Sequence, residues 1–249
     1  MTAWWQRHRL ATAIGLEIAA IALTLIGAAV LSALLPGLPG YSVTGPSDSL
    51  VLVIVLAVAV LAVIGLMRWW RLAGFTPPSQ WRQPQLFVLP IVLLAAPFVA
   101  GVHPLPAVTV GLLLLAYLAT AVYEESLWRG AILGLLRPTG LWRAALLSAL
   151  LFGLGHLANS ALRGLSLIIL AQAFGAAVQG VGLAALRLRT QTLWPLIPLH
   201  ALHDLFLQLG NLPIPLVEVP IDTVFLVYGI ILLRRRSRVL TNSDQHGQQ

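Results

Sequence analysis

Ionisable side chains lie within several apolar stretches of the sequence, where a charged group is costly unless it is paired or has a function. The stretch "AVYEESLWRG", residues 121–130, carries two glutamates and an arginine, and two later stretches carry histidines and an aspartate. Ionisable groups inside apolar segments are candidate functional residues by default. A carboxylate beside imidazoles can take a proton from water, which is the chemistry of general acid–base hydrolysis. The candidates are Glu124, Glu125, Arg129, His156, His200 and Asp204.

The spacing of these residues separates supporting groups from reactive ones. Glu125 and Arg129 are four residues apart with the acid on the N-terminal side, the favourable order for an ion pair on one helix face. Glu124 points about 100° away from Glu125 around the same helix and is left without that partner. We therefore expect the Glu125–Arg129 pair to be structural and Glu124 to be available for chemistry. His200 and Asp204 are also four apart, so the carboxylate can orient the imidazole.

Three further residues could belong to the same site. Phe152 lies one turn before His156, so on a helix its ring can wall the site. Glu17 has no partner in sequence and lies outside the cluster, so it is either a polar packing contact or a functional acid. His203 follows His200 on the same segment and could line the same pocket. A single histidine in such a segment is more often a hydrogen-bonded packing residue, so a site requires several of these groups to meet.

The composition is that of a membrane protein. Of 249 residues, 59% are hydrophobic and only 9% are charged, and the mean hydropathy is +0.90. The absence of cysteine excludes disulfides and thiolate catalysis. The formal charge of +7 comes from arginine alone, and on apolar segments such a balance reflects membrane topology. We therefore expect a lipid bilayer and no nucleic acid among the partners.

Apolar runs of about membrane-spanning length recur along the chain and are separated by short connections that carry Pro, Gly or Arg. They predict an all-α fold, a polytopic membrane bundle of about eight transmembrane helices. Residues 1–238 would form a single integral-membrane domain and residues 239–249 a disordered polar tail. The predicted spans are Leu10–Leu35, Leu50–Met67, Leu86–Gly101, Ala107–Leu136, Leu141–Leu157, Leu165–Leu186, Leu193–Leu209 and Val219–Leu233.

Arginines occupy alternate connections, which orients the predicted bundle. The other connections hold Arg163 together with the acids Asp48, Glu218 and Asp222. The positive-inside rule then places both termini in the cytoplasm, which requires an even number of spans. Counted from the arginines at 1.5 Å per residue, the candidate groups on three helices lie roughly 16–20 Å from the cytoplasmic face. Their similar depth predicts that they meet near the middle of the membrane.

Three ordered motifs give the sequence a family resemblance. The segment "EESLWR" fits EExxxR, "FGLGH" fits FxxxH and "HALHD" fits HxxxN/D. In this order the motifs resemble those of the CAAX-protease and bacteriocin-processing family of intramembrane proteases, which includes type II CAAX prenyl endopeptidases and the bacterial Abi proteins. The resemblance covers roughly residues 80–210. It implies an intramembrane endopeptidase, and here we expect one in a bacterial cell membrane.

The resemblance also implies a role for each matching residue. Glu124 would activate the water, His156 would work beside it, and Glu125 with Arg129 would be the supporting pair. His200 and Asp204 would stabilise the oxyanion or help to hold a metal. Asparagine is frequent in the family where this chain has Asp204, and an ionised aspartate cannot donate a hydrogen bond. An aspartate is therefore better suited to orienting His200 or binding a cation.

The sequence leaves more than one possibility for the cofactor, the substrate and the function. His156, His200 and Glu124 could hold a divalent metal such as zinc, but HExxH is absent and the ligands would come from separate helices. The expected substrate is a peptide or a membrane-protein segment. A family member without catalysis, acting as a binding, immunity or scaffold protein, is the main alternative. Ion- or proton-coupled transport is disfavoured because the sequence shows no repeated halves.

Overall fold

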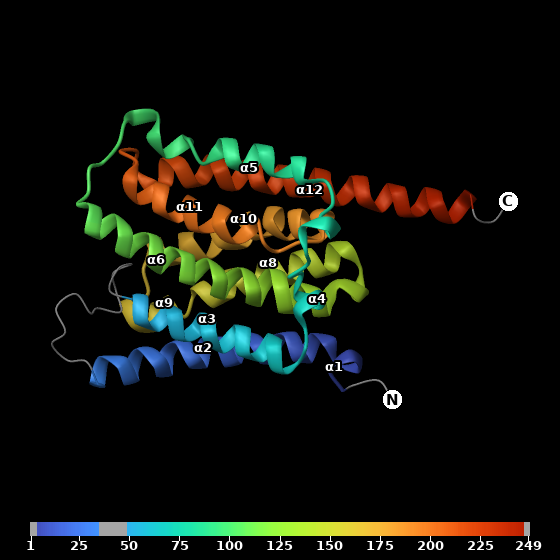
Figure 1. The fold of residues 1–249 in the computed structure, drawn as a ribbon, viewed down its shortest axis with the longest axis horizontal. Coiled ribbons are helices and arrows are strands. Elements are labelled where there is room, and N and C mark those ends of the chain that lie inside the picture. Colours follow the sequence, from blue (N-terminus) through green and yellow to red (C-terminus); the bar gives the residue numbers. More distant parts are fainter. Residues whose placement is uncertain (1–3, 35–48, 247–249) are drawn as a thin grey trace.

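The computed structural model describes residues 4–34 and 49–246, and their regular structure is helical. Within these ranges the only β-type pairing is an isolated bridge between Val102 and Gly210. The all-α expectation is therefore confirmed. The longer helices run roughly side by side as a bundle (Figure 1). They are α2 (Arg9–Leu34), α3 (Leu50–Leu66), α6 (Ala107–Glu124), α8 (Leu141–His156), α10 (Leu167–Thr190), α11 (Leu196–Leu209) and α12 (Ile214–His246).

Short helices join these long ones. One of them, η4, is a π-helix that follows α6 without a break and leads directly into α7. The short elements are α1 (Trp4–Arg7), α4 (Trp70–Ala73), η1 (Pro78–Gln80), η2 (Pro84–Phe87), α5 (Val88–Leu93), η3 (Ala96–Ala100), η4 (Glu125–Ile132), α7 (Leu133–Leu136), η5 (Arg137–Thr139) and α9 (Asn159–Arg163).

The bundle has the helix lengths and the surface of a membrane protein. Within the described ranges, five helical segments are long and apolar enough to cross a membrane. Three shorter apolar helices coincide with the other predicted spans, so the count of eight stays a prediction. Large apolar side chains cover the outside, among them Leu66 at 82%, Val99 at 82% and Leu167 at 84% exposure. Such continuous apolar surface is unfavourable in water and favourable in lipid.

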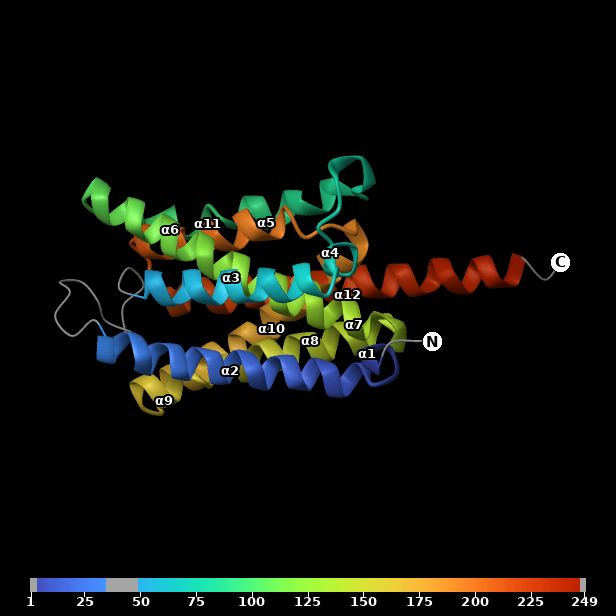
Figure 2. The same ribbon diagram turned by 60° about the horizontal axis from the view of Figure 1, so that its bottom comes forward.

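Helix α10 forms the centre of the packing. Its C-terminal half is buried continuously from Gly180 to Leu188, and it packs against α8 on one side and α12 on the other. At Gly182 a Cβ atom would lie 2.6 Å from the carbonyl oxygen of Phe225 on α12. Backbone therefore touches backbone at this crossing, an approach that only glycine permits. The α2–α3 pair lies along the other side of the bundle (Figure 2).

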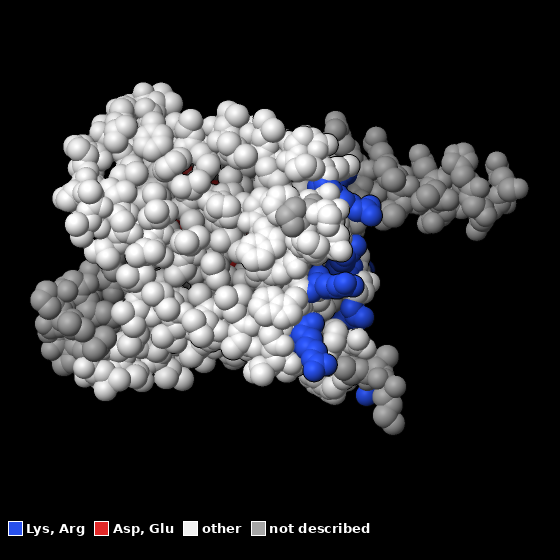
Figure 3. Space-filling view, viewed as in Figure 1, with Lys and Arg blue, Asp and Glu red and all other residues white. Residues whose placement is uncertain are grey.

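On the face drawn in Figure 3, the exposed arginines lie at one end of the molecule, whereas Arg129 is buried inside the bundle. On this face the blue side chains gather at the end from which α12 protrudes, and the rest of the described surface is nearly free of charge. Helix α1 lies at the same end (Figure 1). This arrangement agrees with the arginine pattern in the sequence, whereas the side of the membrane on which this end lies stays a prediction.

Two predicted elements differ from the structure. The span expected over Leu86–Gly101 is broken into η2, α5 and η3, because Pro97 clashes with the carbonyl of Leu93, four residues earlier, and ends α5 there. Helix α12 begins at Ile214 and continues to His246, where a disordered tail was expected from residue 239. No Pro or Gly interrupts residues 230–246, so helix propagation continues beyond the apolar part. Residues 247–249 lie outside the described ranges.

Candidate active site

The EExxxR motif lies on the π-helix η4, which continues directly from Glu124 at the end of α6. All eight residues of η4 are buried. The α-helical geometry expected for this motif is therefore wrong, although Glu125 and Arg129 still form their ion pair, with 3.2 Å between Oε1 and Nη1. Single π-helical turns are rare and occur mostly at functional sites, where they re-aim side chains.

Glu125 also holds His200, which comes from a distant helix. Its Oε1 atom lies 2.9 Å from His200 Nδ1, and both side chains are buried. A carboxylate at this position accepts a hydrogen bond, so Nδ1 is the protonated nitrogen. Glu125 therefore holds Nδ1 across 75 residues of sequence, a contact that the spacing of His200 and Asp204 did not predict, and the orienting role of Asp204 stays a prediction.

The other nitrogen of His200 faces two carboxylates. Nε2 lies 3.6 Å from Glu124 Oε2 and 3.6 Å from Asp204 Oδ2. Glu124 and Asp204 keep 15% and 24% of their side-chain surface exposed, whereas Glu125 keeps none. The free acid, the imidazole and the final-motif aspartate predicted from the sequence therefore meet at one nitrogen atom.

His156 and Phe152 complete the group. His156 Nδ1 lies 2.9 Å from the carbonyl oxygen of Phe152, which can only accept, so Nε2 of His156 is left available. The Phe152 ring lies 4.7 Å from the His156 ring and 6.5 Å from the His200 ring. The guanidinium of Arg129 stacks 3.8 Å from the centre of the same ring. Phe152 thus packs against both imidazoles and the Arg129 guanidinium and walls the site.

Glu124 and His156 line one cavity of about 180 Å³ between α2, α3, α6, α8 and α9. Tyr123, Trp128 and Asn159 also line it. A space of this size holds several waters, and its polar groups are placed to bind them. On the other side of His200, a smaller cavity of about 20 Å³ has room for about one water and is also lined by His203 and Gln179.

Glu17 lies closer to this site than the sequence suggests. The indole nitrogen of Trp128, on η4, donates to Glu17 Oε2 over 2.8 Å, and Glu17 is buried. Its other oxygen lies beside Gly155, the residue before His156, where a Cβ atom would be 2.9 Å away. Glu17 therefore links α2 to the motif-bearing helices through Trp128. This contact favours the interpretation of Glu17 as a polar packing residue over its interpretation as a functional acid.

A second polar cluster was missed by the sequence interpretation. His203 Nε2 lies 2.9 Å from Glu218 Oε1, and the Gln179 amide lies 3.4 Å from the same nitrogen. Glu218 and Asp222 were assigned to a connection outside the bundle, but both belong to α12. The proline at position 215, in the first turn of α12, is the signal that could have shown this.

Among the described residues, no three or more His, Asp or Glu side chains are grouped so that they could hold a metal ion. The divalent metal implied by the family resemblance stays a prediction, and no chemical step below depends on it.

Fold and site together define a class: a helical integral membrane protein with carboxylates and imidazoles gathered inside the bundle. Residues 106–206 match the family described as type II CAAX prenyl endopeptidase Rce1-like. This match confirms the resemblance predicted from the three motifs, and it spans all of the candidate site residues from Glu124 to Asp204. The description of this family names an endopeptidase. No curated protein and no solved structure matches the chain significantly.

Proposed function

We propose that this protein is an intramembrane endopeptidase that hydrolyses a peptide bond with water activated by Glu124. The observation that carries the proposal is the convergence on His200: Glu125 on Nδ1 at 2.9 Å, and Glu124 beside Nε2 at 3.6 Å. Glu124 is partly exposed and lies beside an imidazole that the buried Glu125 orients, an arrangement suited to proton transfer. A purely structural Glu125–Arg129 pair would not require a second acid at this position.

The first step is attack by water held between Glu124 and His156. With Nδ1 of His156 committed to a backbone carbonyl, its Nε2 accepts one hydrogen of the water, and the Glu124 carboxylate accepts the other. Glu124 takes its proton as the water oxygen bonds to the scissile carbonyl carbon. Glu124 then returns this proton to the leaving nitrogen as the C–N bond breaks, so the carboxylate is regenerated.

His200 acts on the negative charge that develops on the carbonyl oxygen. When protonated, it donates from Nδ1 to Glu125 and presents its Nε2 hydrogen to the oxyanion. The Asp204 carboxylate beside Nε2 favours the charged imidazolium. The substrate would be a peptide or a membrane-protein segment. The cavity was expected to open toward the cytoplasm, whereas its lining reaches Ser49, Asn159 and Leu162, at the end of the bundle opposite the arginines.

The test is the isosteric variant Glu124→Gln, which keeps the shape of the side chain and removes its basicity. We expect a loss of cleavage of about 10²–10⁴-fold with unchanged thermal unfolding. Comparing membrane peptides in cells that carry wild type or the variant would reveal uncut substrates. Glu17→Gln is the matched control, because its amide oxygen can still accept from Trp128.

Two outcomes would contradict the proposal. Normal cleavage by Glu124→Gln would remove the base from the mechanism. A peptide profile that does not differ between wild type and the variant, in cells where both proteins are folded, would favour a family member that binds partners without cleaving them.

A further inference from the structure

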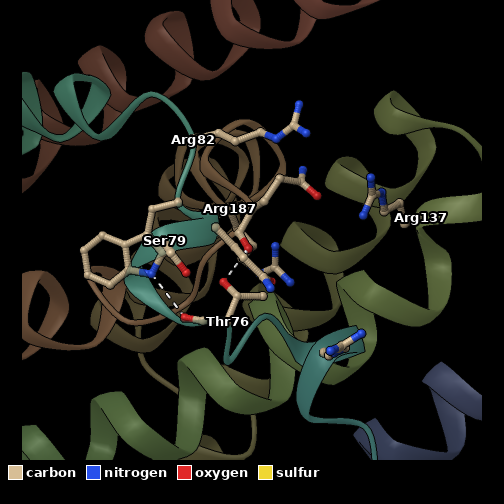
Figure 4. A pocket seen from close by; sticks show the side chains of 9 residues that line it. Thr76, Ser79, Arg82, Arg137 and Arg187 are labelled. Atoms are coloured by element: carbon tan, nitrogen blue, oxygen red, sulfur yellow. Dashed lines mark hydrogen bonds between the residues drawn. The ribbon is translucent and has the colours of Figure 1, made fainter.

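A second and larger cavity lies at the arginine-rich end of the bundle, away from the candidate active site. Its volume is about 610 Å³. Guanidinium groups from four separate segments line it, with hydroxyl, amide and indole side chains between them (Figure 4). None of its described lining residues is an acid. The lining residues are Arg71, Thr76, Ser79, Gln80, Trp81, Arg82, Arg137, Arg187 and Gln191.

Arg187 is a fixed, buried part of this cavity. It is 6% exposed, and its Nε and Nη2 atoms each donate over 3.2 Å, to the carbonyl oxygens of Ala73 and Leu72 at the end of α4. Gly74, with φ +90°, makes room for it, because a Cβ atom there would overlap the guanidinium. The cation is thus held in place by backbone that only glycine can form.

The segment that carries Arg82 is also tied down. The Thr76 hydroxyl donates to the carbonyl of Gln191 over 3.0 Å, and the Trp81 indole donates to the carbonyl of Thr76 over 3.1 Å. The backbone nitrogen of Arg82 donates to the carbonyl of Thr190 over 2.8 Å. The wall formed by this segment is therefore ordered before any ligand arrives, which lowers the entropy lost on binding.

We propose that this cavity binds a phosphate group, and that its source is the headgroup of an anionic phospholipid. Guanidinium groups that line one cavity, with no acid among its described lining residues, favour an anion as the ligand, and their planar forks match phosphate oxygens in pairs. The cavity lies at the end of the apolar bundle where the arginines gather (Figure 3), at the level where lipid headgroups would lie. Basic pockets at this level between membrane helices are suited to anionic headgroups.

The test uses full-length protein that has been stripped of lipid in detergent. Native mass spectrometry would count bound phosphatidylglycerol and phosphatidylcholine, and thermal unfolding would be followed with each lipid and with inorganic phosphate alone. We expect at least about a tenfold preference for phosphatidylglycerol, since each arginine near the surface contributes roughly fivefold. The preference should vanish in the variant that combines Arg71→Gln, Arg82→Gln and Arg137→Gln.

The matched control combines Arg68→Gln with Arg143→Gln. These exposed arginines lie at the same end but outside the cavity, so their removal should leave the preference within about twofold of wild type. If the triple variant does not fold, the single variants Arg82→Gln and Arg137→Gln carry the test, with a smaller loss expected from each.

The two sources of phosphate give different results. Stabilisation by inorganic phosphate that the triple variant loses, without a lipid preference, would support the phosphate site and assign it to a free anion. Equal binding of both lipids without any effect of phosphate would overturn the proposal. So would a loss of preference that is as large in the control pair as in the triple variant. Peptidase activity is not part of the readout, so failure here leaves the proposed function untouched.

Discussion

Both histidines of the candidate site are oriented through the same ring atom. The carboxylate of Glu125 accepts from Nδ1 of His200, and the carbonyl of Phe152 accepts from Nδ1 of His156. In each case Nε2 is the nitrogen left for chemistry. Spacing along one helix correctly predicted the Glu125–Arg129 pair, because four residues bring side chains to one face. It could not predict the Glu125–His200 bond, which depends on how two separate helices pack.

Substitutions of Glu125 test whether this acid supports the structure of the site, as proposed here, while Glu124 carries out the reaction. Replacing it with alanine leaves the buried Arg129 charge without its carboxylate, so we expect unfolding to become easier by about 3–5 kcal/mol. Combining Glu125→Leu with Arg129→Met removes both charges and should restore most of the stability. Cleavage should stay low in the double variant, because His200 Nδ1 still lacks its acceptor. Thermal unfolding and cleavage measured together check this, and an unfolding midpoint unchanged in Glu125→Ala would refute it.

Two substitutions of Asp204 test what this side chain contributes to the reaction. The family resemblance associates asparagine with this position, and an amide fits where Asp204 lies, 3.6 Å from His200 Nε2. We expect Asp204→Asn to keep cleavage within about tenfold of wild type, since the amide can donate to the oxyanion, and Asp204→Ala to lose about 10²–10³-fold. Rates measured on one substrate would decide. Equal losses in both variants would mean that only the carboxylate charge matters.

Among the elements, the π-helix and the glycine crossings set the geometry of the site. Hydropathy predicted where apolar helices run, because burial in lipid requires a long apolar stretch. It could not show that residues 125–132 are π-helical, since that depends on local packing, such as the hydrogen bond of 2.7 Å from the Ser148 hydroxyl to the Trp128 carbonyl. It also placed the start of α12 too late, because the acids there looked like a connection, and so missed the His203–Glu218 contact.

The α10–α12 crossing can be tested with one methyl group. Gly182→Ala would place a Cβ atom 2.6 Å from the carbonyl oxygen of Phe225, so α12 must move, and we expect a loss of about 1–3 kcal/mol in stability. Gly111→Ala on α6 is the matched control: nothing lies within 4 Å of its Cβ position, and the change should be neutral or stabilising by up to about 1 kcal/mol. Thermal unfolding in one detergent compares them. If both variants unfold alike, the crossing does not depend on this backbone contact.

At the scale of the whole molecule, charge and apolar surface are separated. Arginines gather at one end, apolar side chains face outward along the bundle, and the carboxylates of the site lie inside it. The arginine pattern in the sequence indicated this end in advance, because alternate connections of a bundle fall on the same side. It could not show that four of these side chains would surround one cavity, since they come from segments spread over more than a hundred residues of sequence.

The side of the membrane on which the arginine end lies can be tested with cysteines, because the chain has none of its own. Thr139→Cys in η5 at the arginine end and His103→Cys between η3 and α6 at the other are exposed sites. If positive charge keeps the arginine end in the cytoplasm, a membrane-impermeant maleimide should label His103→Cys in intact cells. Thr139→Cys should react only after lysis. The reverse pattern would place the arginine end outside. It would also turn the proposed headgroup site toward the outer leaflet, since the cavity moves with that end.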